Sequence, residues 1–168
     1  MAGIKAPIND LLTYLSTGTS FSYVRVWNNQ FQWMEEKSIE AFPFPCIFIE
    51  TILPNDNAGL GFTVADVVFR IHIGQTEYDA ADGTMEQNLS IFDLRDEVIR
   101  LLTYKEVTGC SGLQKINEEQ DYLHTNVYHY IIDFKCSFVD SKGDQTQGQV
   151  TNYPTTLIID PVTIVTEI

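Results

Sequence analysis

The segment EEQDYLHTNVYHY, residues 118–130, holds the densest group of side chains that could do chemistry. Within thirteen positions it carries three carboxylates and two imidazoles, namely Glu118, Glu119, Asp121, His124 and His129. Side chains of these types bind zinc or transfer protons in enzymes. The alternative is that they form a polar approach to a buried strand. The choice decides whether the chain is interpreted as an enzyme.

The spacing of these residues favours the structural alternative. His124 and His129 are five positions apart, so on one continuous strand their side chains would point to opposite faces. His129 shares its face with Asp133 and Lys135, which predicts a solvent-facing position. His124 is expected in the connection before that strand, and the carboxylates in a solvated loop. We therefore predict no catalytic, cofactor-binding or metal-ligating residues, no cofactor and no enzymatic activity.

Other motifs typical of enzymes are missing from the sequence. GxSxG, GxxxxGK[ST], GxGxxG and CxxC do not occur. His72 is expected on the polar face of a strand, next to Arg70. Cys46 and Cys136 lie in apolar strand patterns, which predicts buried thiols rather than disulfides and fits a reducing compartment.

The composition predicts one folded domain with an acidic surface. The chain has 168 residues, of which 44% are hydrophobic and 12% aromatic. Its formal net charge of −13 and its scattered basic residues argue against a nucleic-acid-binding patch. The charge fits either plain solubility or a surface that DNA passes without sticking. The first residues lack an apolar signal core, so we expect the chain to be made in the cytosol.

The elements that must position these side chains follow from hydrophobic periodicity. A helix is expected from about Pro7, with Gly18 as its C-terminal cap. Strands are expected over residues 46–53, 63–74 and 127–139. Asn28 and Asn29 separate two short alternating runs, which predicts a tight β-hairpin because Asn tolerates positive φ.

A second, long amphipathic helix is expected before the last strands. Thr84 and Gln87 form a capping box, and the apolar stripe continues to Leu102, about twenty residues in all. The order of elements predicts an α+β fold with an antiparallel or mixed β-sheet, two helices packed on one face and an extended C-terminal β arm. The expected organisation is a domain over 1–140, a flexible polar linker over 141–154 and the arm over 155–168. The arm either returns to its own sheet or adds to the sheet of a neighbouring subunit.

This layout resembles the tail-terminator, tail-completion and neck-ring proteins of tailed bacteriophages, which form the head–tail connector. The resemblance covers about residues 5–140 and rests on element order. The matching stretches are the helix at 7–16, FPFPCIFIE, VVFRIHIG, TMEQNLSIFDLRDEVIRLLT and INEEQDYLHTNVYHYIIDFKCSFVD.

The resemblance implies a virion structural protein without catalytic residues. It would be made in the host bacterial cytoplasm and would form a six-fold or twelve-fold homo-oligomeric ring in the neck or tail, without membrane contact. The ring would join the portal or connector to the tail. DNA would pass through its lumen without sequence-specific binding.

If the chain forms such a ring, loops and the C-terminal arm are expected to make many of the contacts. The tryptophans beside the expected hairpin fit either the core or such a contact. The predicted contact residues between subunits or rings are Trp27, Asn28, Asn29, Phe31, Trp33, Asn57, Leu60, Tyr78, Leu157, Ile158, Ile159, Val162 and Ile164.

Three alternatives remain beside the ring. A non-enzymatic adaptor would bind one protein partner through the hairpin tryptophans. A small metal-dependent enzyme would bring the Glu118–His129 cluster together with His72 in a pocket with perturbed pKa values. An acidic mimic of DNA would space its carboxylates regularly along one face.

Overall fold

A computed structural model describes residues 3–37, 42–53, 63–76, 89–124 and 127–140. In chain order the elements are α1 (Lys5–Gly18), β1 (Tyr23–Val26), α2 (Gln30–Lys37), β2 (Cys46–Ile52), β3 (Thr63–Thr76), α4 (Ser90–Leu102), β4 (Gln114–Asp121) and β5 (Val127–Asp140). The predicted contact and capping residues Asn57, Leu60, Tyr78, Thr84 and Gln87 lie outside these ranges, as do the linker and the arm. None of the helices that the structure describes is long and apolar enough to cross a membrane.

The strands form one five-stranded mixed sheet in the order β1-β2-β3-β5-β4. β1 runs parallel to β2, and the other neighbouring pairs are antiparallel. β3 and β5 pair along their whole length, from Thr63 opposite Asp140 to Thr76 opposite Val127. The predicted α+β class is confirmed, and of the two alternatives for the sheet, antiparallel or mixed, the structure has the mixed one.

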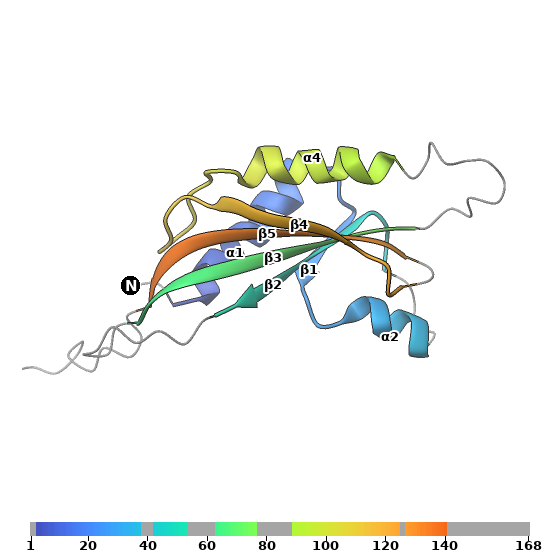
Figure 1. The fold of residues 1–168 in the computed structure, drawn as a ribbon, viewed down its shortest axis with the longest axis horizontal. Helices are drawn as coiled ribbons and strands as arrows, with labels where there is room; N and C mark the ends of the chain where they lie inside the picture. The colour runs from blue at the N-terminus through green and yellow to red at the C-terminus, as the bar shows by residue number, and fades with distance from the viewer. Residues whose placement is uncertain (1–2, 38–41, 54–62, 77–88, 125–126, 141–168) are drawn as a thin grey trace, which may run out of the picture.

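One face of the sheet carries the main core, defined by the buried side chains that α1 and α4 cover. Figure 1 shows α1 behind the sheet and α4 running along it. Pro7 is tolerated in the first turn of α1, where its missing N–H would have no intrahelical partner. Leu11 and Leu15 lie one turn apart and are fully buried. On the sheet, β3 contributes every second residue from Val67 to Ile73, as its alternation predicts.

The described part of the predicted long helix is α4. Its buried side chains recur at helical spacing, and they are Ile91, Leu94, Val98 and Leu102. Together with α1, this helix confirms the expectation of two helices on one face.

The opposite face carries a second core, consisting of Phe31, Cys46, Phe48 and Val127. No helix is expected on this face from the sequence, but α2 covers one end of it. Figure 1 shows α2 apart from the other two helices. Gly74 makes this close packing possible, because a Cβ there would overlap the tip of the Phe31 ring.

The hairpin predicted at Asn28-Asn29 is wrong. Asn29 does adopt positive φ, at 56°, and the chain turns there, but it turns into a helix. The Gln30 side chain accepts a hydrogen bond from the Asn28 backbone N–H and donates one to the Val26 carbonyl, which fixes the helix start. Phe31 and Met34, three positions apart, then face the second core, so the apolar period is helical rather than alternating.

Candidate functional site

Three neighbouring strands place a row of polar side chains beneath α2. Glu50 comes from β2, His72 from β3 and His129 from β5. The strand registers set Phe48 opposite His72 and Gly74 opposite His129, so the two imidazoles lie diagonally across the β3–β5 pair. Asp121, the last residue of β4, lies directly opposite His129.

The row is a continuous chain of short polar contacts. Glu50 Oε2 lies 3.2 Å from His72 Nε2, and His72 Nδ1 lies 3.0 Å from His129 Nε2. His129 Nδ1 in turn lies 3.0 Å from Asp121 Oδ2. Three contacts of this length call for three protons between the atoms. Two neutral imidazoles carry only two N–H groups, so one junction lacks a hydrogen-bond donor.

Both imidazoles in the row are buried. His72 is 4% exposed and His129 is 2% exposed. The Trp27 indole stacks on His72 with 4.0 Å between ring centroids and 9° between planes. Phe31 on α2 covers His129 at 4.8 Å.

This burial lowers the pKa of both histidines. The pKa of His72 falls to about 3, mainly because burial disfavours the charged ring and secondly because Arg70 is near. Burial also lowers the pKa of His129, and the neighbouring His72 adds to the shift. The charged or titratable groups around His72 are Glu50, Arg70, Asp121, His124, His129 and Asp133. Both rings are therefore neutral at pH 7.

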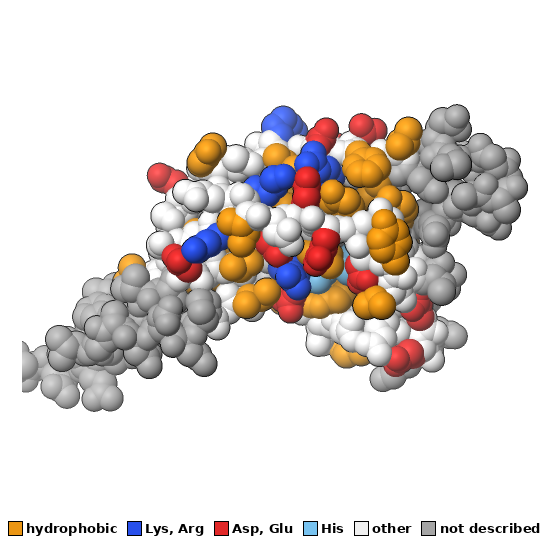
Figure 2. All heavy atoms as spheres, in the orientation of Figure 1, with side chains coloured by type: hydrophobic (Ala, Val, Ile, Leu, Met, Phe, Trp, Pro, Cys, Tyr) orange, Lys and Arg blue, Asp and Glu red, His pale blue; other side chains and the backbone are white. Residues whose placement is uncertain are grey.

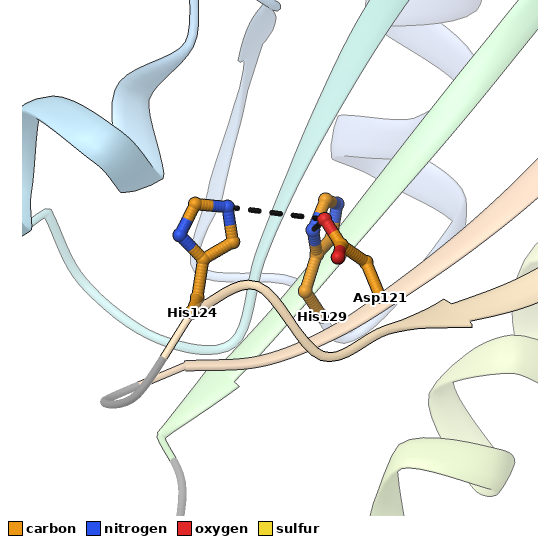
Figure 3. Close-up of side chains that lie close together, drawn as sticks. All are labelled: Asp121, His124 and His129. Atoms are coloured by element: carbon orange, nitrogen blue, oxygen red, sulfur yellow. Dashed lines mark hydrogen bonds and ion pairs between the residues drawn. The ribbon is translucent and has the colours of Figure 1, made fainter.

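His124 completes the cluster from the connection between β4 and β5. Its Nε2 lies 4.0 Å from Asp121 Oδ2, and its Nδ1 lies 3.3 Å from Glu35 Oε2 on α2. Figure 3 shows the Asp121 carboxylate beside the His129 imidazole, with a dashed line to His124. One potential ligand atom from each of these three residues lies within 4.8 Å of the others.

The cluster borders a pocket of about 580 Å³. Its polar lining includes Gln32, Glu35, Glu50, Arg70 and Asp121, and its apolar lining includes Trp27, Leu123 and Ile131. Carboxylates and imidazoles beside a pocket can hold a metal ion or transfer a proton.

The structure corrects the prediction that the carboxylates lie in a solvated loop before the strand. Glu118, Glu119 and Asp121 belong to β4 rather than to a loop. His129 shares its face with Asp133, as expected, but it is buried rather than solvent-facing because α2 covers that end of the face. Asp121 and His129 therefore do lie together with His72. This convergence is what the enzyme alternative predicts.

Glu118 points to the other face of β4 and does not join the cluster. It makes two contacts with the Arg95 guanidinium on α4, at 2.7 and 2.9 Å. These hydrogen bonds lower the pKa of the Glu118 carboxyl. This pair ties the edge of the sheet to α4 and has a structural role.

The predicted contact residues on α2 and before it have different environments. Trp27 is half-buried and faces the second core, whereas Trp33 is 38% exposed. Asn28 and Asn29 are exposed. Phe31 is fully buried within the chain, so it offers no surface to a neighbour. Leu157, Ile158, Ile159, Val162 and Ile164 lie outside the described residues.

Exposed apolar side chains occur at both edges of the sheet. Val26 on the edge strand β1 is 47% exposed, and Ile116 on the opposite edge strand β4 is 52% exposed. Tyr122 and Leu123, which directly follow β4, are 80% and 84% exposed. The β4 edge was not expected, because the sequence predicts a solvated loop for Glu118, Glu119 and Asp121.

Comparison with known proteins gives no assignment for this site. No family model matches the sequence, and no curated protein matches it.

Proposed function

We propose that this chain is a non-enzymatic structural protein of a tailed-phage virion. It forms an oligomeric ring at the head–tail interface, as a neck ring or tail terminator, and joins the portal or connector to the tail. The proposal starts from the resemblance in element order, which rests on the stretches that contain α1, β2, β3, α4, β4 and β5.

The observation that carries the proposal is the pair of edge strands at opposite sides of one sheet. β1 and β4 each have one strand neighbour among the described elements, and each carries an exposed aliphatic side chain. An edge strand presents unpaired backbone groups that a strand of another chain can pair with. Because the two edges differ, a contact between β4 of one copy and β1 of the next is head-to-tail. Such contacts close into a ring when the rotation per copy divides a full turn.

The charge distribution of the sheet is compatible with a wall that DNA passes. On the part of the face beyond α2, Arg70 pairs with Asp133 at 2.8 Å and Lys135 pairs with Asp66 at 2.6 Å. Figure 2 shows basic side chains beside acidic ones on the face turned to the viewer. These cations are neutralised by carboxylates, and the whole chain has a net charge of −13. Such a surface would repel the phosphates of DNA.

A charge at one edge tests the ring proposal. Ile116→Asp places a charge at the register shift of β4, on the edge that a neighbouring strand would approach, so it should convert rings to folded monomers. Leu89→Asp is the matched control, because Leu89 is 59% exposed and directly precedes α4, where a carboxylate complements the helix dipole. Light scattering should show rings for the wild type and the control. Rings that persist in Ile116→Asp would refute the proposed edge contact, and a monomeric wild type would favour the adaptor.

The histidine cluster favours a small metal-dependent enzyme as the second candidate. It ranks second because His72 and His129 have both ring nitrogens in contact with each other or with carboxylates. Neither imidazole is free to act as a base on a substrate. Zinc-dependent hydrolysis of an activated ester by the purified protein, abolished by His124→Gln, would favour the enzyme.

A further inference from the structure

We propose that Asp121, His124 and His129 bind one divalent first-row transition-metal ion, with zinc as the test case. The ligand atoms are Asp121 Oδ2, His124 Nε2 and His129 Nδ1. This inference goes beyond the proposed ring and does not depend on it.

The ligand atoms are already close to the spacing that zinc requires. Asp121 Oδ2 lies 3.0 Å from His129 Nδ1 and 4.0 Å from His124 Nε2. Four ligands at bond lengths of roughly 2.0–2.1 Å in a tetrahedron are about 3.3 Å apart. Small side-chain movements would therefore complete the ligand set. Figure 3 shows the three side chains gathered together, with the Asp121 carboxylate next to the His129 ring.

Each histidine also has a partner on its other nitrogen, as ligating histidines normally do. Glu35 Oε2 lies 3.3 Å from His124 Nδ1, so it would accept the N–H of that ring when Nε2 binds the ion. His72 Nδ1 lies 3.0 Å from His129 Nε2 and would accept the N–H of His129. His72 would then donate its own N–H to Glu50, 3.2 Å away.

A metal ion also supplies the cation that the row of polar contacts lacks. With His129 donating to His72 and His72 donating to Glu50, the lone pair of His129 Nδ1 faces the Asp121 carboxylate across 3.0 Å. Two acceptors at this distance repel each other unless a proton or a cation lies between them. A bound metal ion would turn this unfavourable junction into two coordination bonds.

The donor types and the pocket select the class of ion. Two imidazole nitrogens and one carboxylate oxygen suit zinc and its first-row neighbours, whereas calcium and magnesium favour oxygen ligands. The pocket beside the cluster leaves room for water as a fourth ligand. Because Glu35 lies on α2, a bound ion would fix the β4–β5 connection and α2 together, so it should raise the melting temperature.

The test is titration of the chelator-treated full chain with Zn²⁺ and Co²⁺. Calorimetry should give one Zn²⁺ per chain, and the melting temperature should rise with zinc concentration. Co²⁺ should show the intense visible absorption of a four-coordinate site. Asp121→Asn and His124→Gln should each weaken zinc binding by at least about 100-fold. Removing a carboxylate that only hydrogen-bonds to a metal ligand typically weakens binding by roughly 10–100-fold. Glu35→Gln should fall within that smaller range.

Glu119→Gln is the matched control, because it makes the same charge change two residues from Asp121 on an exposed part of β4. It should bind zinc like the wild type. Near-ultraviolet circular dichroism of the metal-free variants separates loss of a ligand from loss of the fold, and the near-isosteric Asp121→Asn keeps the test valid if His124→Gln unfolds. Absence of zinc binding by the wild type would overturn the proposal. Equal affinity in wild type, Asp121→Asn and Glu119→Gln would overturn it as well.

Discussion

Replacing Gly74 with alanine should destabilise the protein, and the penalty should depend on Phe31. Gly74 lies in β3 beneath α2, and a Cβ at this position would overlap Phe31 Cζ. It would also lie 2.8 Å from both Cys46 Sγ and Phe31 Cε1. Phe31 and Cys46 are fully buried, so neither can move aside without disturbing the second core.

The magnitude follows from two opposing contributions. Alanine is favoured over glycine within a strand by roughly 0.5–1 kcal/mol, because glycine loses more backbone freedom on folding. Overpacking a well-packed core costs roughly 1–3 kcal/mol. Because all three contacts of the new Cβ are shorter than 3.0 Å, the overpacking cost should lie in the upper half of its range, about 2–3 kcal/mol, and the net loss in the free energy of unfolding should be about 1–2.5 kcal/mol.

A double-mutant cycle isolates the clash from other effects. Phe31→Leu removes the ring atoms that the new Cβ would meet, so Gly74→Ala should cost less in that background, by at least about 0.5 kcal/mol. Urea unfolding gives the free energy of unfolding of each variant, provided that its dependence on urea concentration has the same slope in all of them. Gly18→Ala is the control, because its Cβ would meet a movable Leu101 methyl at 3.0 Å and should change stability by less than about 1 kcal/mol. A neutral Gly74→Ala, or an equal penalty in both backgrounds, would refute the packing of α2 on the sheet.

Three further predictions concern pH, thiol reactivity and the tail. With a chelator present, the contribution of His72 to stability should be constant well above pH 6.5 and should be lost as the pH falls through that value, because the unfolded chain binds a proton on His72 that the folded chain excludes down to about pH 3. The loss from this residue should reach about 2 kcal/mol at pH 5 in urea titrations, and His72→Phe should reduce the slope. Burial raises the pKa of the Cys46 thiol, so this residue should resist alkylation in the native protein and react in Phe31→Ala, as peptide mapping would show. A chain truncated after Asp140, where β5 ends, should remain folded but assemble poorly. Unfolding of the truncated chain in circular dichroism would instead place the tail in its own core.

The long strands could be predicted from sequence because their alternation is complete. In β5 the even-numbered residues from Tyr130 to Phe138 are buried in the main core, as the pattern indicates. The placement of α1 and α4 on one face follows from the same periodicities. These left the choice between an antiparallel and a mixed sheet open, which the parallel pairing of β1 with β2 decides. The buried end of the opposite face could not be predicted, because α2 was interpreted as one strand of a hairpin. Phe31 and Met34 at helical spacing were the available indication.

The candidate site depended on contacts between distant segments. His72 and His129 lie 57 positions apart, and only the register of β3 with β5 brings them within 3.0 Å. His129 lies on the same strand face as Asp133, four positions later, and without α2 these two polar residues indicate a face turned to solvent. The position of Glu35 beside His124 depends on the same helix, 89 positions away in the chain. Local periodicity contains no information on such pairs.

The central claim, assembly of the chain into a ring, is tested most directly by its mass in solution. Light scattering across a concentration series, with electron microscopy of the large species, measures both the number of copies and their arrangement. The account predicts closed six-fold or twelve-fold rings that accumulate with concentration and disappear in Ile116→Asp. A wild-type protein that remains monomeric at every concentration would contradict it.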